Sequence, residues 1–291
     1  MHPIACTGWR STRSELSIGS AVGFNWQLEI GDFMISVCQL DQIDYITGLQ
    51  LQQRLVELRK SGMIGDVLLL LEHSPVITLG RNAKRENVVA SAEELSQRGV
   101  ELFDCDRGGD VTFHGPGQLV GYPIFDLRSF PSSDPKRRHL GVVEYVRQLE
   151  EVLIRSCADF GIATKRIAGL TGVWTTETQE AKIAALGVHI SRGVTSHGFA
   201  LNVDIDLSYF DLIIPCGIAS KPVTSIQKEL GREVSLQDVA HSVSRNFGAV
   251  FASQVLWLEN LDALLGGPVG VPVRLPKELK DLHKEEDQFW A

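Results

Sequence analysis

An apolar stripe in the middle of the sequence constrains the fold more than any other feature. Its members recur every three or four residues, and they are Val142, Val146, Leu149, Leu153, Cys157 and Phe160. This spacing places them on one face of an α-helix. A helix with such a face must cover an apolar body, so the stripe predicts a layered fold with Cys157 in its core.

Strand-like runs lie on both sides of this helix. They are short and rich in β-forming side chains, and they cover residues 33–40, 67–71, 76–79, 100–103, 119–125, 183–190 and 198–205. Because these runs interleave with helices, the sequence predicts a mixed α/β class, also described as α+β. We expect a single domain whose mixed sheet is flanked by helices and need not be all parallel.

Helix boundaries can be predicted at several places. The leucines of Leu51–Leu58 stand at helical spacing, and Gly62 is expected to stop that helix. Ser91 followed by Glu94 forms a capping box for a short helix, and a longer helix is expected to begin after Ser235. No repeat and no change of composition divides the middle of the chain. We therefore expect a poorly ordered extension at residues 1–32, one core domain at 33–265 and a peripheral tail at 266–291.

Composition and charge exclude several classes of protein. The chain has 291 residues, of which 44% are hydrophobic and 22% are charged, so disorder as the main state is excluded. Its 28 basic and 36 acidic residues leave a net charge of −8, which does not suit a nucleic-acid partner. The densest apolar run, Val67–Leu71, is far shorter than the roughly 18 residues that a membrane span needs, so no membrane partner is expected.

The cysteines indicate the compartment. There are five, an odd number, scattered without a C-x-x-C pair. This pattern fits neither a disulfide framework nor a zinc knuckle, and it indicates a reducing, cytoplasmic location. A mitochondrial leader is the alternative, because Arg10 and Arg13 stand among serines. Glu15 follows closely, however, and argues against an acid-poor leader.

The most unusual local sequence is glycine-rich and runs from Arg107 to Gln118. Its glycines allow the main chain to approach a ligand closely, so the segment can form a pocket wall with Arg107 and His114 as its polar groups. It is not a phosphate-binding P-loop, since the pattern G-x-x-x-x-G-K-[ST] is missing. A plain glycine-rich hairpin explains the spacing equally well.

A second candidate feature is Cys216, which stands between Pro215 and Gly217. Proline and glycine would display its thiol at a strand end or a sharp turn, which suits a nucleophile. Burial as a small apolar side chain is the more common fate of a free cysteine. A nucleophile also needs a nearby base or cation, because a free thiol with a pKa of about 8.5 is mostly protonated at neutral pH.

Three side chains could activate this thiol: Lys182, His189 and His197, all in the strand-like runs that precede it. Beside apolar residues a lysine can act as a base, whereas at a strand end it is simply solvated. His197 could orient a substrate or satisfy a core hydrogen bond. A metal site that gathers His73 and His114 with these side chains is less favoured, since no short ligand spacing such as H-E-x-x-H occurs.

Taken together, four segments resemble the lipoyl(octanoyl) transferases, the octanoyltransferases of lipoate biosynthesis. They are Arg107–Tyr122, Lys182–Gly187, Thr195–Val203 and Pro215–Gly217. The first fits the family pattern R-G-G-x-x-T-[FYW]-H-x-x-G-Q-x-x-x-Y at every position, and the others follow in the family's order. The resemblance covers about residues 33–260. It implies a fold related to the catalytic domains of biotin and lipoate ligases.

This resemblance implies an enzyme that moves an octanoyl group from octanoyl-acyl carrier protein to a specific lysine of a lipoyl domain, through a thioester on the enzyme. Cys216 would be the nucleophile, and Lys182 would lower its pKa and move protons. The core domain would be the catalytic domain, and no cofactor would be needed. The residues that would line the acyl and pantetheine channel are Arg107, Gly108, Gly109, Asp110, Val111, Thr112, Phe113, His114, Ala185, Leu186, Gly187, Gly198, Phe199 and Ala200.

The implied partners are octanoyl-acyl carrier protein, the lipoyl domains of 2-oxoacid dehydrogenase complexes and the glycine cleavage H protein. Because such partners are typically acidic, docking on this acidic chain would depend on local basic clusters. These are Arg81, Lys84, Arg85, Lys136, Arg137 and Arg138. The alternatives are an ATP-dependent lipoate or biotin ligase of the same fold, a non-catalytic module that binds acyl carrier protein and, less favoured, a thioester hydrolase.

Overall fold

Two β-sheets form the framework of the protein in this computed structural model, which describes residues 33–265 except for 177–178 and 216–220. The larger sheet consists of β1 (Met34–Ile43), β2 (Asp66–His73), β6 (Gln118–Ile124), β7 (Thr164–Ile167), β8 (Leu170–Thr175), β9 (Lys182–Ser191), β10 (Val194–Asn202) and β11 (Gln254–Leu258). The smaller sheet consists of β3 (Val76–Leu79), β4 (Glu101–Asp104) and β5 (Val111–His114). The expected extension at 1–32 and tail at 266–291 lie outside the described residues.

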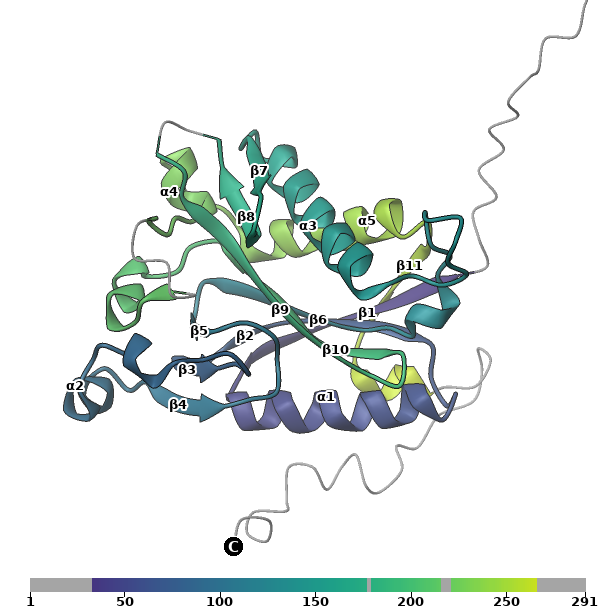
Figure 1. Ribbon diagram of the computed structural model, residues 1–291, viewed down its shortest axis with the longest axis horizontal. Coiled ribbons are helices and arrows are strands. Elements are labelled where there is room, and N and C mark those ends of the chain that lie inside the picture. Colours follow the sequence, from purple (N-terminus) through teal and green to yellow (C-terminus); the bar gives the residue numbers. More distant parts are fainter. Residues whose placement is uncertain (1–32, 177–178, 216–220, 266–291) are drawn as a thin grey trace, which may run out of the picture.

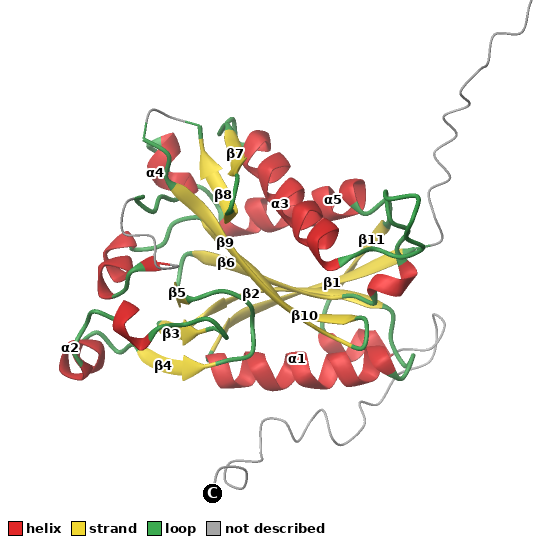
Figure 2. Cartoon of the chain, viewed as in Figure 1, coloured by secondary structure: helices red, strands yellow, loops and turns green. Residues whose placement is uncertain are grey.

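Helices connect these strands, as Figure 2 shows. The α-helices are α1 (Tyr45–Lys60), α2 (Ala92–Gln97), α3 (Val142–Asp159), α4 (Ile226–Leu230) and α5 (Leu236–Val250). The 3-10 helices are η1 (Arg85–Asn87), η2 (Leu127–Ser129), η3 (Leu207–Leu212) and η5 (Leu261–Leu265). Within the described ranges, no helix is both long and apolar enough to cross a membrane.

The strand directions are mixed. The order in the larger sheet is β11-β1-β2-β6-β10-β9-β8-β7. β1 runs parallel to β2 and to β11, whereas the neighbouring pairs from β2 to β7 are antiparallel. In the smaller sheet, β3 is parallel to β4 and antiparallel to β5. The predicted mixed α/β class with a mixed, helix-flanked sheet is therefore confirmed.

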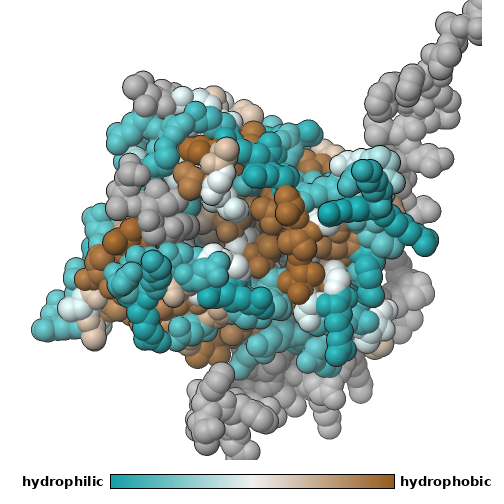
Figure 3. Space-filling view, in the orientation of Figure 1, coloured by the Kyte–Doolittle hydropathy of each residue, from teal (hydrophilic) through white to brown (hydrophobic). Residues whose placement is uncertain are grey.

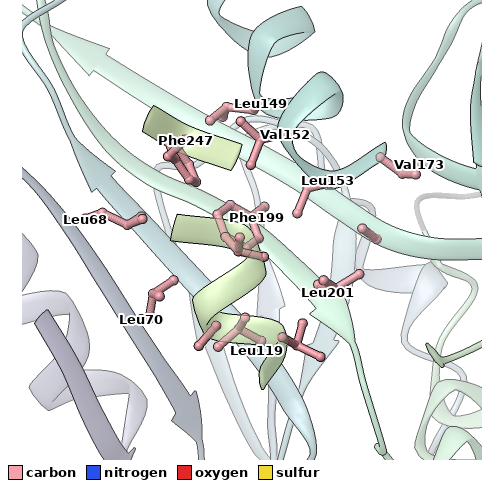
Figure 4. Packing of buried hydrophobic residues seen from close by; sticks show 14 of the residues in the cluster. Leu68, Leu70, Leu119, Leu149, Val152, Leu153, Val173, Phe199, Leu201 and Phe247 are labelled. Atoms are coloured by element: carbon pink, nitrogen blue, oxygen red, sulfur yellow. The ribbon is translucent and has the colours of Figure 1, made fainter. Parts of the chain in front are cut away.

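Helices cover both faces of the larger sheet (Figure 1). α3 and α5 lie side by side on one face, and α1 lies on the other. Beneath α3 and α5, Leu149, Leu153 and Phe247 pack with Phe199 and Leu201 of β10 (Figure 4). A second apolar cluster joins α1 to the opposite face, and a third fills the space between the smaller sheet and η3. These layers hold β9 and β10 from both sides.

The predicted stripe is the buried face of α3. Leu149, Leu153 and Cys157 are fully buried, as expected, while Val142 in the first turn is half exposed. Burial raises the pKa of the Cys157 thiol to about 12, so this cysteine stays protonated. It is a core side chain and not a reactive thiol.

The predicted capping residues also act as expected. Ser91 Oγ accepts the N–H of Glu94 at 3.2 Å, and Ser235 Oγ accepts the N–H of Asp238 at 3.4 Å. Each bond satisfies a donor that the first turn of a helix leaves without a partner inside the helix. These caps fix where α2 and α5 begin.

Some of the described strands escape prediction from the sequence: β5, β7, β8 and β11. β5 is four residues long and lies inside the glycine-rich segment, so the turn residues around it hide its pattern. β7 and β8 form a short antiparallel pair whose register shifts between Lys165 and Ile167. Pairing with neighbours, and not local composition, defines such short strands.

β1 has partners that are far away in the sequence. Ile35 pairs with Asp66 at the start of β2, and Met34 pairs with Gln254 at the start of β11. β11 forms the edge of the sheet. The first and the last described strands are therefore direct neighbours.

Candidate functional site

A cavity lies where β5 of the smaller sheet faces β9 and β10 of the larger sheet. It encloses about 470 Å³, part of which is open to solvent. The predicted residues that line it are Arg107, Gly109, Asp110, Thr112, His114, Ala185, Leu186, Gly187, Gly198, Phe199 and Ala200. The glycine-rich segment and two strand-like runs are thus brought together at one space.

Three other predicted residues belong elsewhere in the described chain. Val111 and Phe113 lie in the apolar cluster on the other side of β5, where Phe113 stacks on Tyr209 with 4.7 Å between the ring centroids. Gly108 donates its N–H to the carbonyl of Val188 at 3.0 Å. Strand geometry explains the division, because successive side chains point to opposite faces of β5.

Four lining residues are absent from the predicted set: Tyr45, Val120, Tyr122 and His197. Tyr122 is the last position of the motif pattern, so that pattern could have identified it. The sequence allows His197 either an orienting or a core role, and the structure places it at the cavity. Tyr45 comes from α1, and no local signal in the sequence connects α1 with this site.

The glycine-rich segment approaches β9 very closely. A Cβ on Gly187 would lie 2.6 Å from the carbonyl oxygen of Gly108, and real Cβ atoms essentially never come within 3.0 Å. Glycine is therefore required where the segment touches β9. The segment both connects β4 to β5 and forms a wall of the cavity.

Apolar surface continues from β9 into the cavity. In Figure 3, hydrophobic side chains gather at the middle of the face, beside α3 and β9. On β9 itself, Leu186, Val188 and Ile190 are only half-buried. Because Leu186 also lines the cavity, an apolar ligand can enter along this strand.

Arg107 places a buried guanidinium at the cavity. Its Nε and Nη2 atoms donate to Thr78 Oγ1 at 3.1 and 2.9 Å, and Nη2 also donates to Thr78 O at 2.7 Å. Nη1 donates to the carbonyl of Gly108 at 3.1 Å. These neutral oxygens fix the guanidinium, and no carboxylate of the described residues forms an ion pair with it. It can therefore attract a polar group of a ligand.

His114 is held as a neutral ring. Gln118 Nε2 donates to Asn202 Oδ1 at 2.9 Å and to Phe113 O at 3.2 Å, so the oxygen of Gln118 faces His114. His114 Nδ1 lies 2.8 Å from that oxygen and carries the hydrogen. Burial lowers the pKa of His114 to about 3. The ring therefore stays uncharged at neutral pH.

His73 is neutral for the same reason. Its Nδ1 donates to the carbonyl of Ile43 at 3.1 Å, and its Nε2 accepts the hydroxyl of Tyr122 at 2.6 Å. Burial lowers the pKa of His73 to about 4. Tyr45 stacks on His114 with an interplanar angle of 6°. We call His73, His114, Tyr45 and Tyr122 the ring cluster; it adjoins the cavity and carries no charge.

A histidine pair links β9 and β10 to Asp106, the residue before the glycine-rich segment. His197 Nε2 donates to Asp106 Oδ1 at 2.7 Å, and His189 Nε2 lies 3.6 Å from Asp106 Oδ2. The hydrogen bond from His197 lowers the pKa of Asp106 to about 2. His197 has a φ of 55° and gives its backbone N–H to Gln52 Oε1 at 2.7 Å. A left-handed non-glycine residue in a strand is strained, so this packing must hold it in place.

Lys182 begins β9 and lines a second, smaller space of about 270 Å³. Thr112 and Ala185 line both spaces, so this space adjoins the cavity. Lys182 is only 6% exposed, and its Nζ lies 4.8 Å from the ring centroid of Trp174. Such burial is inconsistent with a solvated lysine at a strand end.

Cys216 lies outside the described residues. The residues before and after the segment 216–220 are described, and two of them lie close to Lys182. Pro215 lines the same space as Lys182, and Pro222 accepts the backbone N–H of Lys182 at 2.8 Å.

The structure also bears on the other cysteines and on the hypothesis of a metal site. Burial raises the pKa of Cys38 to about 11, and Cys105 is half-buried. Cys6, like Cys216, falls outside the described part of the chain. Among the residues that the structure does describe, no group of three or more His, Cys, Asp or Glu side chains is arranged to hold a metal ion.

Comparison with known proteins gives one consistent family. A model of the lipoyl protein ligase A/B catalytic domain matches residues 44–248. An octanoyltransferase of Koribacter versatilis is 64% identical over 253 residues, which are 87% of this chain and 98% of that protein. An octanoyltransferase of Acidobacterium capsulatum is 60% identical over 237 residues, covering 80% of this chain and 96% of the other.

Solved structures share the fold. A bi-partite lipoate protein ligase of Thermoplasma acidophilum superposes with a TM-score of 0.59 at 17% identity, covering 80% of this chain and 91% of that one. A lipoate-protein ligase A bound with ATP gives a TM-score of 0.58 at 15% identity, covering 78% and 88%. The expected relation to lipoate ligase catalytic domains is confirmed at the level of the fold.

Proposed function

This chain belongs to the lipoyl protein ligase A/B catalytic domain family, and we propose on that premise that it moves an octanoyl group from octanoyl-acyl carrier protein to a lysine of lipoyl domains. It is an acyltransferase. The proposal adds the donor, the acceptor and a thioester intermediate on Cys216. One observation carries it: Lys182 and Pro215, the residue before Cys216, line a single space that adjoins the cavity.

In the first step, the thiolate of Cys216 attacks the carbonyl carbon of the octanoyl thioester. A carbon–sulfur bond to Cys216 forms, the bond to the carrier's pantetheine sulfur breaks, and that sulfur takes up a proton. The ammonium of Lys182 stabilises the thiolate before the attack and supplies the proton afterwards. One thioester replaces another, so no ATP is consumed.

In the second step, the amine of the acceptor lysine attacks the acyl-enzyme. An amide bond forms, the bond to Cys216 breaks, and the proton lost by the amine is taken up at Lys182. Amide formation from a thioester runs downhill, which drives the overall transfer. Lys182 ends the cycle in the ammonium form in which it began.

The cavity provides the site for the octanoyl chain. Its walls include Val120, Leu186, Phe199 and Ala200, which are apolar, and the adjoining ring cluster is uncharged. Arg107 offers a cation for the polar end of the acyl ligand. An acyl chain therefore loses contact with water against these apolar and neutral groups, while its polar end meets the Arg107 guanidinium.

The partners are proposed from the same relation. The Thermoplasma protein was solved as part of a lipoylation system with its E2 lipoyl domain. We extend this type of acceptor to the present chain, as lipoyl domains of 2-oxoacid dehydrogenase complexes and the glycine cleavage H protein. The carrier protein would approach the exposed basic residues Arg137 and Arg138.

An assay of octanoyl transfer tests the proposal. Octanoyl-acyl carrier protein and an apo lipoyl domain are incubated with the enzyme, with and without ATP, and products are followed by intact mass. We expect octanoylation of the acceptor without ATP and a covalent octanoyl adduct on the enzyme.

Each rival predicts a different result in this assay. A strict need for ATP, and transfer that survives Cys216→Ala, would identify a ligase. Carrier binding without an adduct would identify a binding module, and thioester loss without acceptor modification a hydrolase. The identities of 60–64% to octanoyltransferases, against 15–17% to the ligase structures, favour the transferase.

A further inference from the structure

Trp174 is a buried aromatic residue beside the proposed catalytic lysine. It lies on β8 directly opposite Lys182 on β9, so both side chains point to the same face of the sheet. Trp174 is 1% exposed, and its Nε1 donates to the carbonyl of Leu170 at 3.4 Å. The indole is thus fixed in orientation, and the Nζ of Lys182 lies over its ring.

Close packing keeps the lysine over the ring. A Cβ on Gly172 would lie 2.9 Å from the carbonyl oxygen of Ala184, 3.2 Å from Lys182 Cε and 3.5 Å from Trp174 Nε1. Glycine, with a φ of 137° here, therefore lets β8 pack closely against the backbone of β9 and the stem of Lys182. The backbone of Lys182 is tied as well, since Thr224 donates its N–H to the Lys182 carbonyl at 2.9 Å. The stem and the backbone are both held, and the ammonium is directed to the ring.

A second cation shares the same indole. Lys221 Nζ lies 5.8 Å from the ring centroid of Trp174. Lys221 also forms an ion pair with Glu180, which pairs with Lys165 at 2.6 Å. The carboxylate of Glu180 therefore balances the charge of Lys221. A balanced neighbour repels the Lys182 ammonium less than an isolated cation would at this range.

From this geometry we infer that Trp174 is a positioning residue for the acyl transfer, which holds the Lys182 ammonium by a cation–π contact at the smaller space that adjoins the cavity. The face of an aromatic ring attracts a cation through its quadrupole, most strongly for tryptophan and most strongly away from water. The inference rests on the proposed role of Lys182.

The sharpest test changes the electronics of the ring and leaves its shape nearly unchanged. Fluorinated tryptophans are placed at position 174, and each added fluorine withdraws electron density from the ring face. We expect kcat/KM for octanoyl transfer to fall stepwise with the number of fluorines, mainly through kcat. We also expect the pH midpoint for alkylation of Cys216 to rise in the same order.

Natural substitutions give a coarser version of the same test. Trp174→Leu removes the ring face and is expected to lower kcat/KM about 10- to 30-fold. Trp174→Phe keeps a weaker aromatic face and should retain a larger part of the activity. Trp257→Leu is the matched control, since Trp257 packs against His241 with 4.6 Å between the ring centroids, on β11 at the opposite edge of the sheet. Thermal unfolding of each variant checks that it folds.

The outcomes separate this inference from the proposed function. If Lys182→Ala reduces transfer and raises the alkylation midpoint while the fluorinated series stays flat, Lys182 keeps its role and the inference about Trp174 is overturned. If Lys182→Ala changes neither quantity, the proposed function of Lys182 itself fails. Should Trp174→Leu not fold, the fluorinated series and Trp174→Phe still decide.

Discussion

The two ends of the site differ in the charge of the side chains that form them. At the ring cluster, His73 and His114 are kept neutral by burial, and their ring nitrogens are hydrogen-bonded to neutral partners. At the other end, Lys182 lies over Trp174, and Glu180 joins two further lysines in ion pairs. The first end consists of neutral rings beside the Arg107 guanidinium, and the second holds several lysines with a carboxylate.

This difference suits one end to binding the acyl chain and the other to the chemical steps. The neutral ring cluster accepts an apolar chain, and its two histidines carry no acidic imidazolium that would protonate a thioester. A charged end can stabilise a thiolate and move protons. Thr112 and Ala185, which line both spaces, mark the boundary where the reacting carbonyl would lie. Binding and chemistry should therefore respond separately to mutation.

The largest effect is expected from Cys216→Ala, which removes the proposed nucleophile and leaves the ring cluster intact. Transfer should fall at least about a thousandfold, and the octanoyl adduct should vanish from the intact mass. Affinity for octanoyl-acyl carrier protein should stay within about threefold. Cys105→Ala is the matched control and should keep both the adduct and the activity. A persistent adduct on Cys216→Ala would refute the assignment.

Lys182→Ala removes the cation of the charged end. We expect kcat to fall about a hundredfold, in the range of general acid–base effects, and alkylation of Cys216 at neutral pH to slow markedly. KM for the acyl donor should change little, because the cavity is untouched. Lys228→Ala, at an exposed lysine of α4, is the control. Unchanged alkylation would remove the activating role of Lys182.

Gln118→Leu instead removes hydrogen bonds that hold the ring cluster. It leaves the Nδ1–H of His114 without its acceptor and deprives Asn202 Oδ1 of a donor, both at buried positions. The free energy of unfolding should fall by about 3 kcal/mol in urea titration. Gln97→Leu on the exposed surface of α2 should cost less than about 0.5 kcal/mol. Equal costs for the two variants would contradict the described network.

The neutral histidines also predict how stability depends on pH. Their folded pKa values, about 4 for His73 and about 3 for His114, lie below the value of about 6.5 for an unfolded histidine. Below pH 6.5 these two histidines bind protons in the unfolded chain but stay neutral in the folded chain. The free energy of unfolding should therefore fall as pH drops from about 6.5 towards 4, by about 1 kcal/mol per pH unit for each histidine.

Urea titrations at pH 7, 6 and 5 measure this slope. His114→Gln should flatten it, because the variant has one buried imidazole fewer. His241→Gln, at an exposed histidine of α5, should leave the slope as it is. A wild-type stability that does not change between pH 7 and 5 would show that these rings are charged or exposed.

The smallest effect is expected far from Lys182, at the opposite end of β9. The turn after β9 is tied to η2, because Leu127 donates its N–H to Gly193 O at 2.9 Å, and the loop that follows η2 carries Arg137 and Arg138. Reversing both to Glu should weaken carrier-protein affinity about three- to tenfold at low salt, with kcat unchanged. High salt should erase the difference from wild type. Arg232→Glu serves as a control, and an equal loss there would argue against this docking surface.

Much of the architecture follows from local patterns in the sequence. The stripe that includes Leu149 and Leu153 predicts α3, and the caps at Ser91 and Ser235 predict where α2 and α5 begin. These features are local, because a helix satisfies its own hydrogen bonds. β5 is not predicted, since four residues between glycines carry too little pattern and their partners lie on β3.

The site is predictable where a motif is continuous and unpredictable where distant strands meet. The segment from Arg107 to His114 predicts a cavity wall, although only the alternation of β5 decides that Thr112 faces the cavity and Phe113 does not. Trp174 escapes notice, because its relation to Lys182 exists only through the pairing of β8 with β9. Cys216 stays a prediction from its motif.

The pairing of β1 with β11 has a consequence for synthesis of the chain. Until Gln254–Leu258 has left the ribosome, one edge of β1 has no partner strand, and an open edge is a template for pairing with another chain. Products that stop short of residue 254 should therefore aggregate even though every residue of the site has already been made. The last described strand thus covers an edge of β1, although none of its residues lines the cavity or the smaller space.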